Sequence, residues 1–132
     1  MNLWLDAHAI LRFLVNDHEE HARRVEGLLE RAGRGDVQLV VTALVIAECT
    51  WVLNSFYKRD RVEIAEGLLR FLAADGLTLP EEDAVLEGLR LMLTRSVDFA
   101  DAYLAACAKG RGEAVASFDL DYRKLSCEVV TP

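Results

Sequence analysis

Apolar positions in this chain follow two different spacings that take turns along the sequence. Short, mostly apolar runs, such as Val37 to Val41 with Gln38 inside it, are typical of buried strands. By contrast, Val25, Leu28 and Leu29 recur at the spacing of one helix face. Turn signals such as Gly33-Arg34-Gly35 separate the two kinds of segment. Strands are therefore predicted at residues 2–5, 37–41, 77–79, 114–117 and 128–130.

Residues that favour helix starts stand before several of the periodic segments. Thr42 suits an N-cap, and Asp60 with Glu63 forms a capping-box pattern. Pro80 precedes three acids, which favour the positive end of a helix dipole. Helices are predicted through residues 10–14 and at 17–31, 42–57, 60–74, 80–94 and 98–109. The predicted order is a strand followed by two helices, repeated three times, with two strands at the end.

This alternation predicts an α/β fold in which helices cover both faces of a short, mostly parallel central sheet. With 132 residues the chain is long enough for one full core and too short for two ordinary domains. We therefore expect residues 1–132 to form a single domain. In such folds ligands bind in the crevice beyond the carboxyl ends of the strands, so a site is expected there.

Five acids stand among apolar neighbours, where a carboxylate loses hydration unless it is paired, hydrogen-bonded, protonated or bound to a cation. They are Asp6, Glu48, Asp98, Asp101 and Asp119. Asp6 and Asp119 follow predicted strands and should face the crevice, toward which Glu48 can reach from its helix. Asp98 and Asp101 share the first turn of a helix and repel each other unless a positive charge lies between them. Because the sequence offers no equal set of buried bases, we infer a site for one or two divalent metal ions.

Each acid also has a purely structural interpretation. Asp6 and Asp98 suit the N-caps of the helices that follow them, and Asp101 suits an exposed position near a helix start. The segment Asp119–Asp121 is typical of a turn. Glu48 would be a costly intrusion into an apolar helix face or a surface residue whose head group reaches water. The metal-site hypothesis therefore depends on the combination of acids.

Composition narrows the classes of function. A net charge of −7 argues by itself against a nucleic-acid partner, because phosphate backbones favour basic surfaces. Bound Mg²⁺ would invert the local field, so charge does not exclude such a partner. The longest apolar run, Leu39–Ala47 with Thr42 inside it, is too short to span a bilayer, and Asp6 and His8 interrupt any signal-peptide region. We therefore expect a cytoplasmic protein without membrane contact, whose three cysteines are reduced core thiols.

Four short motifs follow one another along the chain. They are Leu3-Trp4-Leu5-Asp6 with Ile10–Leu14, Val45–Leu53 around Glu48, Asp98–Ala106, and Ser117–Tyr122. Together they resemble the motifs of a PIN domain of the VapC toxin type, over essentially the whole chain. The resemblance implies a three-layer α/β/α sandwich and a Mg²⁺- or Mn²⁺-dependent endoribonuclease that hydrolyses RNA phosphodiester bonds, usually the toxin of a toxin–antitoxin pair. It implies catalytic roles for Asp6, Glu48, Asp101 and Asp119, and metal ligation by Asp6, Asp98, Asp101 and Asp119.

The same resemblance implies two protein partners, a cognate antitoxin and a second copy of the chain in a homodimer. The apolar-rich helices predicted near 43–57 and 60–74 offer a dimer surface. One departure concerns Ala7 and His8, because family members commonly carry Thr or Ser and then Asn after the first Asp. A degenerate PIN fold that binds RNA or protein without cutting is therefore one alternative. An interaction module whose acids are purely structural is another, and it predicts no metal-dependent thermal shift.

Overall fold

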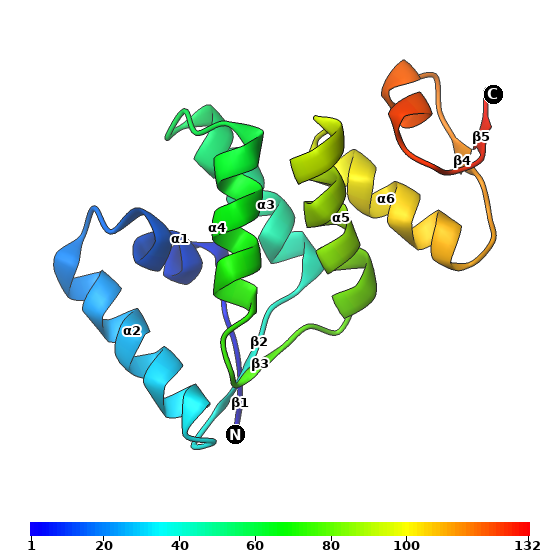
Figure 1. Cartoon of the computed structure of the whole chain (residues 1–132). Coiled ribbons are helices and arrows are strands. Elements are labelled where there is room, and N and C mark those ends of the chain that lie inside the picture. The colour runs from blue at the N-terminus through cyan, green and yellow to red at the C-terminus, as the bar shows by residue number, and fades with distance from the viewer.

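The computed structural model describes residues 1–132 and has a helical majority around short strands (Figure 1). The strands are β1 (Asn2–Trp4), β2 (Gln38–Val40), β3 (Leu77–Thr78), β4 (Val115–Ala116) and β5 (Val129–Val130). The helices are α1 (Ala7–Val15), α2 (Glu19–Gly33), α3 (Ala43–Ser55), α4 (Arg61–Leu72), α5 (Glu82–Arg95), α6 (Phe99–Gly110) and the 3-10 helix η1 (Leu120–Lys124). Their order confirms the predicted alternation, with η1 added between the last two strands.

Local capping explains where several helices begin. The Thr42 hydroxyl accepts a hydrogen bond from the Val45 N–H at 3.3 Å, and the Asp60 carboxylate accepts one from the Glu63 N–H at 2.8 Å. Both predicted caps are therefore confirmed. The start predicted at Pro80 is wrong by two residues, because Pro80 lies in a turn and α5 begins at Glu82 without a side-chain cap.

The central sheet contains β1, β2 and β3 in that order, all parallel. Asn2 pairs with Gln38, and Val40 pairs with Thr78 on the other side of β2. Figure 1 shows α1 and α2 on one side of this sheet and α5 and α6 on the other, which confirms an α/β fold with a parallel sheet between helices. Gly76 has a φ of 86° directly before β3, and an added side chain there would collide with Ala32.

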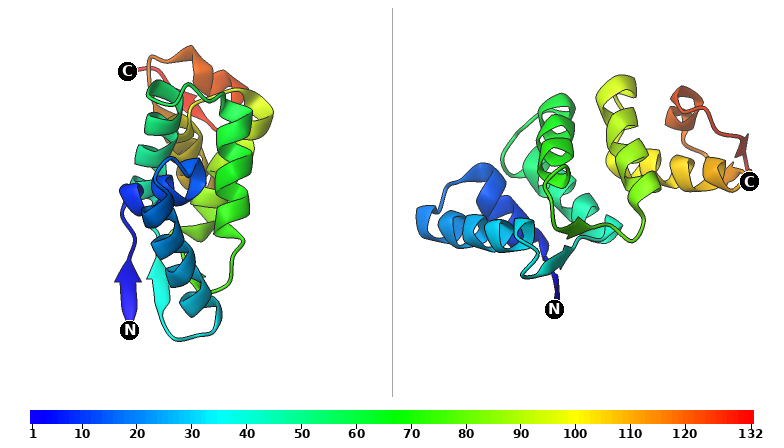
Figure 2. Two further views of the ribbon diagram at one scale, coloured as in Figure 1. Left: turned by 90° about the vertical axis from the view of Figure 1, so that its left-hand side faces the viewer. Right: turned by 60° about the horizontal axis from the view of Figure 1, so that its bottom comes forward.

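The last two strands form a separate sheet. β4 pairs in parallel with β5, through Val115 opposite Val129, and neither strand joins the central sheet. Figures 1 and 2 show this pair beyond α6, at the end of the molecule opposite α2. The sequence predicted five strands and a central sheet, and the structure distributes those strands over two sheets.

Two hydrophobic clusters reflect the same division. A cluster of 21 buried residues surrounds the central sheet and includes Ile46, Leu68 and, from α6, Phe99. A cluster of six, which includes Val97 and Tyr122, packs α6 against β4 and η1. We refer to residues 1–95 as the N-terminal region and to residues 96–132 as the C-terminal region.

Two further expectations concern the cysteines and the membrane. Cys49 is fully buried in the larger cluster, whereas Cys107 and Cys127 are only partly buried. The prediction of three core thiols is therefore wrong for two of them. Cys127 packs at the edge of the small C-terminal cluster, and Cys107 on α6 belongs to neither cluster. None of the helices is long and apolar enough to cross a bilayer.

Candidate metal centre

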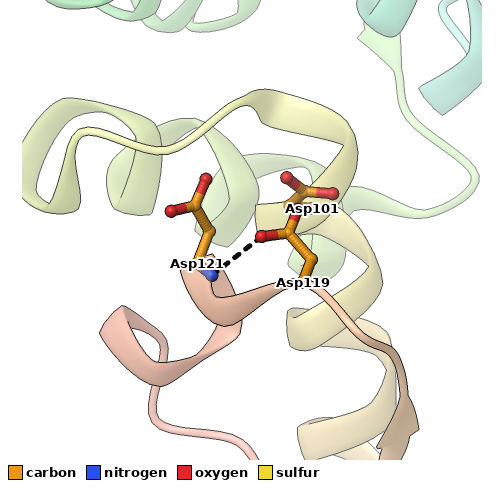
Figure 3. Close-up of side chains that lie close together, drawn as sticks. All are labelled: Asp101, Asp119 and Asp121. Carbon is orange, nitrogen blue, oxygen red and sulfur yellow. Dashed lines mark hydrogen bonds between the residues drawn. The ribbon is translucent and has the colours of Figure 1, made fainter. Parts of the chain in front are cut away.

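Three carboxylates of the C-terminal region converge in space. Asp101 lies in the first turn of α6, Asp119 follows β4, and Asp121 lies in η1. One oxygen from each of the three lies within 4.8 Å of the others (Figure 3). This group, which we call the C-terminal acid cluster, joins two predicted site residues to Asp121, which the sequence pattern assigns to a turn.

The chain after β4 folds so that these acids face one another. The Ser117 hydroxyl accepts a hydrogen bond from the Asp119 N–H, and the Asp119 carboxylate accepts one from the Asp121 N–H, both at 2.9 Å (Figure 3). The second bond caps η1. Tyr122 follows in η1 with only 5% of its surface exposed, and its hydroxyl donates to Oδ1 of Asp101 at 3.1 Å. Asp101 is therefore connected to the helix that carries Asp121.

The acid cluster is electrostatically strained. Burial raises the pKa of Asp101, and the negative charges of Asp119, Asp98 and Asp121 raise it further, whereas the hydrogen bond from Tyr122 lowers it. Burial and the charge of Asp101 raise the pKa of Tyr122 to about 12, so its hydroxyl stays protonated and able to donate. Lys124 is the one cation that pairs with a member of the cluster, at 3.5 Å from Asp121. A divalent cation would relieve this repulsion.

Asp98, predicted as an accessory metal ligand, is engaged elsewhere. It occupies the N-cap position of α6, but its side chain makes no capping bond. Its carboxylate accepts hydrogen bonds from Nε and Nη2 of Arg61, at 3.1 and 2.9 Å. The structure therefore joins Asp98 to the start of α4 and leaves it outside the acid cluster.

The other two predicted acids lie in the N-terminal region, each near enough to Cys49 to act on its pKa. Asp6 follows β1, accepts a hydrogen bond from the Ala9 N–H at 2.9 Å as the cap of α1, and has 72% of its side chain exposed. Glu48 is exposed on α3 and lines a pocket with His8. Burial is the largest cause that raises the pKa of the Cys49 thiol to about 12, and the negative charges of Glu48 and Asp6 raise it further. We call Asp6 and Glu48 the N-terminal acid pair.

The structure does not bring the acid pair and the acid cluster together. The sequence predicts that Asp6 and Asp119 meet, because both follow predicted strands of one parallel sheet. In the structure β1 pairs with β2 and β4 with β5, so the two carboxyl strand ends belong to different sheets. Both views in Figure 2 show the C-terminal region separated from β1.

The donor chemistry of the acid cluster fits a hard divalent cation. Its ligand atoms are carboxylate oxygens, which Mg²⁺ and Mn²⁺ prefer, and no cysteine or histidine belongs to the group. Three close carboxylates still leave coordination positions for water and for a substrate phosphate.

Two residues at this site, one in the cluster and one that donates a hydrogen bond to it, were not among the predicted site residues. Asp121 and Tyr122 were visible only as part of a turn and of a short motif. The pattern Asp-Leu-Asp-Tyr after a strand carries a usable signal, because a turn that begins at the first Asp turns the second Asp toward the same side. The tyrosine contact to Asp101 has no such signal, since it joins residues 21 positions apart.

Comparisons with known proteins agree with the motifs. The family model described as PIN domain matches residues 3–126. A protein named VapC ribonuclease, from Aquifex aeolicus (strain VF5), is 28% identical over 129 residues, which cover 97% of this chain and 95% of that protein. The four motifs, the parallel α/β fold and the family match lead to one conclusion: the chain belongs to the PIN-domain family.

Proposed function

We propose that this protein is a Mg²⁺- or Mn²⁺-dependent endoribonuclease that hydrolyses RNA phosphodiester bonds in the cytoplasm, as the toxin of a toxin–antitoxin pair. The proposed catalytic acids are Asp6, Glu48, Asp101 and Asp119. Asp6, Asp101 and Asp119 are proposed to hold the metal, and the structure adds Asp121 as a further candidate ligand. This role requires Asp6 to approach the acid cluster, from which the structure separates it. Asp98 is an accessory ligand in this proposal, and its ion pair with Arg61 must open for it to take that role.

The C-terminal acid cluster is the observation that carries this proposal. Three carboxylates within 4.8 Å are costly for a folded chain, because their charges repel one another. In a PIN-domain chain whose relative is named a ribonuclease, a metal-binding role accounts for that cost. The same relative supports the toxin assignment, and with it an antitoxin partner.

The residues of the cluster have separable tasks in the proposed mechanism. Asp101 and Asp119 present carboxylate oxygens to the cation, and Tyr122 holds Oδ1 of Asp101 in a fixed orientation. A divalent cation bound there supplies the positive charge that activates water and stabilises charge on the phosphate in the transition state. Ser117 and the backbone of Asp121 orient Asp119 before any ligand arrives. The protein thus contributes a preorganised set of oxygens.

Cleavage of a structured RNA pool by the purified protein, freed of any antitoxin, tests the proposal. The wild type is compared with Asp101→Asn/Asp119→Asn, which removes two charges at nearly constant side-chain size. Asp75→Asn is the matched control, because Asp75 is an exposed acid in a turn of the N-terminal region. We expect cleavage with Mg²⁺ or Mn²⁺ and none with EDTA. We also expect the double variant to lose activity and the Asp75 variant to retain it.

Thermal unfolding with and without Mn²⁺ gives a second measurement that does not depend on catalysis. Binding to the folded state raises the melting temperature of the wild type and of Asp75→Asn, but not of the double variant. Cleavage that persists in EDTA, or that survives in the double variant, would contradict the proposal. A folded wild type that binds RNA without cutting it in any metal would instead support the degenerate binding module.

A further inference from the structure

An open pocket without acidic side chains lies between α1 and α2 and has a volume of about 380 Å³. We call it the basic pocket, and its lining consists of His8, Ala9 and Arg12 from α1 and His21, Arg24 and Val25 from α2. Four other pockets of the chain each have at least one glutamate in their lining. In a chain with a net charge of −7, a pocket lined by two arginines, two histidines and no acid indicates a ligand of negative charge.

Helical spacing and helix packing together place these side chains around one pocket. His8 and Arg12 are four residues apart on α1, and His21 and Arg24 are three residues apart on α2, so each pair shares one face of its helix. The two helices lie side by side (Figure 1). The basic pocket is therefore held by two packed helices and does not depend on a loop.

Both arginines keep hydrogen-bond donors for a ligand. Nη1 of Arg12 donates to Asp17 at 3.3 Å, and Nη2 of Arg24 donates to Glu20 at 2.7 Å. A guanidinium group has more N–H donors than these single bonds use. Both ion pairs are open to solvent and therefore weak, so a phosphate group can compete with the two carboxylates.

The pKa of His21 shows that these ion pairs do not cancel the positive potential of the pocket. Loss of hydration has the largest effect and lowers the pKa of the His21 imidazole. The charges of His18, Arg12 and Arg24 lower it further. Glu20 raises it and has the smallest effect of the five. Because a further positive charge is unfavourable at this position, an anion is favourable there.

The basic pocket adjoins the proposed catalytic acids of the N-terminal region. His8 and Arg12 also line the pocket that contains Glu48, between α1 and α3. Nδ1 of His8 lies 3.9 Å from Oδ2 of Asp6. An RNA strand that is cut beside Asp6 and Glu48 can therefore place another of its phosphates in the basic pocket.

We propose that the basic pocket binds a backbone phosphate of the RNA substrate that is not itself cut. Arg12 and Arg24 supply positive charge, and His8 and His21 supply further N–H donors. This gives a task to His8, one of the two residues at which the chain departs from the family pattern. The proposal rests on the proposed ribonuclease function and adds to it a site that positions the substrate. The shared lining with the Glu48 pocket favours RNA over an acidic protein segment as the occupant.

Binding of a short single-stranded RNA in EDTA, measured by fluorescence anisotropy, tests the pocket without cleavage. Arg24→Gln is compared with Arg23→Gln, since both arginines are 71% exposed and pair with the glutamate four residues earlier, but Arg23 does not line the pocket. We expect Arg24→Gln to bind RNA about tenfold more weakly than wild type and Arg23→Gln to bind as wild type does. The slope of log K against log salt should become shallower by about 0.7 in Arg24→Gln alone. No binding of RNA by the wild type, or equal affinities and slopes in the two variants, would overturn the proposal.

Histidine NMR signals distinguish RNA from other anions, because the chain has only three histidines. Inorganic phosphate, the same RNA and polyglutamate are titrated separately into full-length protein at constant pH and ionic strength. We expect RNA, and phosphate at higher concentration, to shift the signals of His8 and His21, and Arg24→Gln to reduce both shifts. Shifts with phosphate but none with RNA would overturn the proposal. Polyglutamate that binds as tightly as RNA and shifts the same signals would assign the pocket to an acidic protein partner and would overturn it as well.

Cleavage kinetics separate the failure of this proposal from the failure of the ribonuclease function. An uncut phosphate is held equally in the ground state and the transition state, so Arg24→Gln should raise KM about tenfold and leave kcat nearly unchanged. An active Arg24→Gln protein with the wild-type KM would overturn the phosphate site and leave the ribonuclease function standing. A wild type that binds RNA through Arg24 but cuts none in any metal would leave the phosphate site standing and overturn the ribonuclease function.

Discussion

The N-terminal and C-terminal regions hold their acids in different ways. Asp6 and Glu48 lie on the outside of a region whose 21-residue cluster is complete without them. Asp101 and Asp119 belong to a region with a cluster of only six residues, and their carboxylates hydrogen-bond to Tyr122 and to the backbone of η1. The comparison teaches that in the C-terminal region the candidate ligands are also part of the local fold. Substitutions there consequently need folding controls. Of the N-terminal pair, Asp6 needs one too, because it caps α1.

The largest expected difference between the regions concerns thiol reactivity. Burial, assisted by Glu48 and Asp6, raises the pKa of Cys49 from 9.0 to about 12. At a given pH this lowers its thiolate fraction by about a thousandfold, and the thiolate is the reactive form. At about pH 8 we expect a maleimide to modify Cys107 and Cys127 first and to leave Cys49 unmodified, as read by peptide mass spectrometry.

The denatured protein provides the control for this labelling, because all three thiols should then react at similar rates. Raising the pH increases the labelling of Cys49, since its thiolate fraction grows until the pH reaches the raised pKa. Labelling of native Cys49 as fast as Cys127 would contradict the assignment of Cys49 to a closed core.

Substitutions that shorten a buried side chain should lower the free energy of unfolding by different amounts in the two regions. Leu68→Ala, in the 21-residue cluster, should lower the free energy of unfolding by about 2–5 kcal/mol, because Leu68 is fully buried and the cavity closes only partly. Leu125→Ala, in the six-residue cluster, should lower it by less than about 2 kcal/mol, because a small cluster can collapse more fully around the cavity. Denaturant unfolding measures both values.

Hydrogen exchange sharpens this comparison. In Leu125→Ala, faster exchange should be confined to residues 96–132, whereas Leu68→Ala should accelerate exchange throughout the chain. Equal global destabilisation by the two substitutions, with exchange spread over both regions, would indicate one cooperative unit in place of two.

Each region contains a hydrogen bond from a tyrosine hydroxyl to an aspartate, and loss of the two bonds should differ in its effect on metal affinity. Tyr122 donates to Asp101 at 3.1 Å, whereas Tyr57 donates to Asp17 at 3.0 Å in the N-terminal region. Loss of a partner that orients a metal ligand typically costs about 10–100-fold in metal affinity or activity. We expect Tyr122→Phe to lose that much Mn²⁺ affinity by titration calorimetry, and Tyr57→Phe to lose none. Equal Mn²⁺ affinity in both variants would show that Tyr122 does not position Asp101 for an ion.

The ion pair that connects the regions should have the smallest effect. Arg61 and Asp98 are 43% and 71% exposed, so solvent screens their attraction. A double-mutant cycle with Arg61→Gln and Asp98→Asn should give a coupling free energy of about 0.2–1 kcal/mol by denaturant unfolding. A coupling above about 2 kcal/mol would mean that this pair, and not the packing of α5 on α6, holds the regions together.

Much of the fold was predictable because its signals are local. Apolar runs and caps such as Thr42 and Asp60 depend on residues within a few positions of one another, and the strands and helices followed in the predicted order. The errors at element ends were small and also local, as at Pro80, which lies in the turn before α5. Strand pairing has no comparable signal, since β4 has the same short apolar pattern whether it pairs with β1 or with β5.

The candidate site was likewise predictable only in the part that depends on short segments. The sequence alone determined the choice of acids, because a carboxylate among apolar neighbours is unusual. Four motifs also resembled a family that the comparisons then supported. Only the tertiary structure decided which acids meet: Asp101 and Asp119 do so with Asp121, Asp98 turns to Arg61, and Asp6 and Glu48 lie elsewhere. The physical reason is that residue chemistry and helical periodicity are properties of short segments, whereas the meeting of two strand ends depends on packing between segments far apart in the chain.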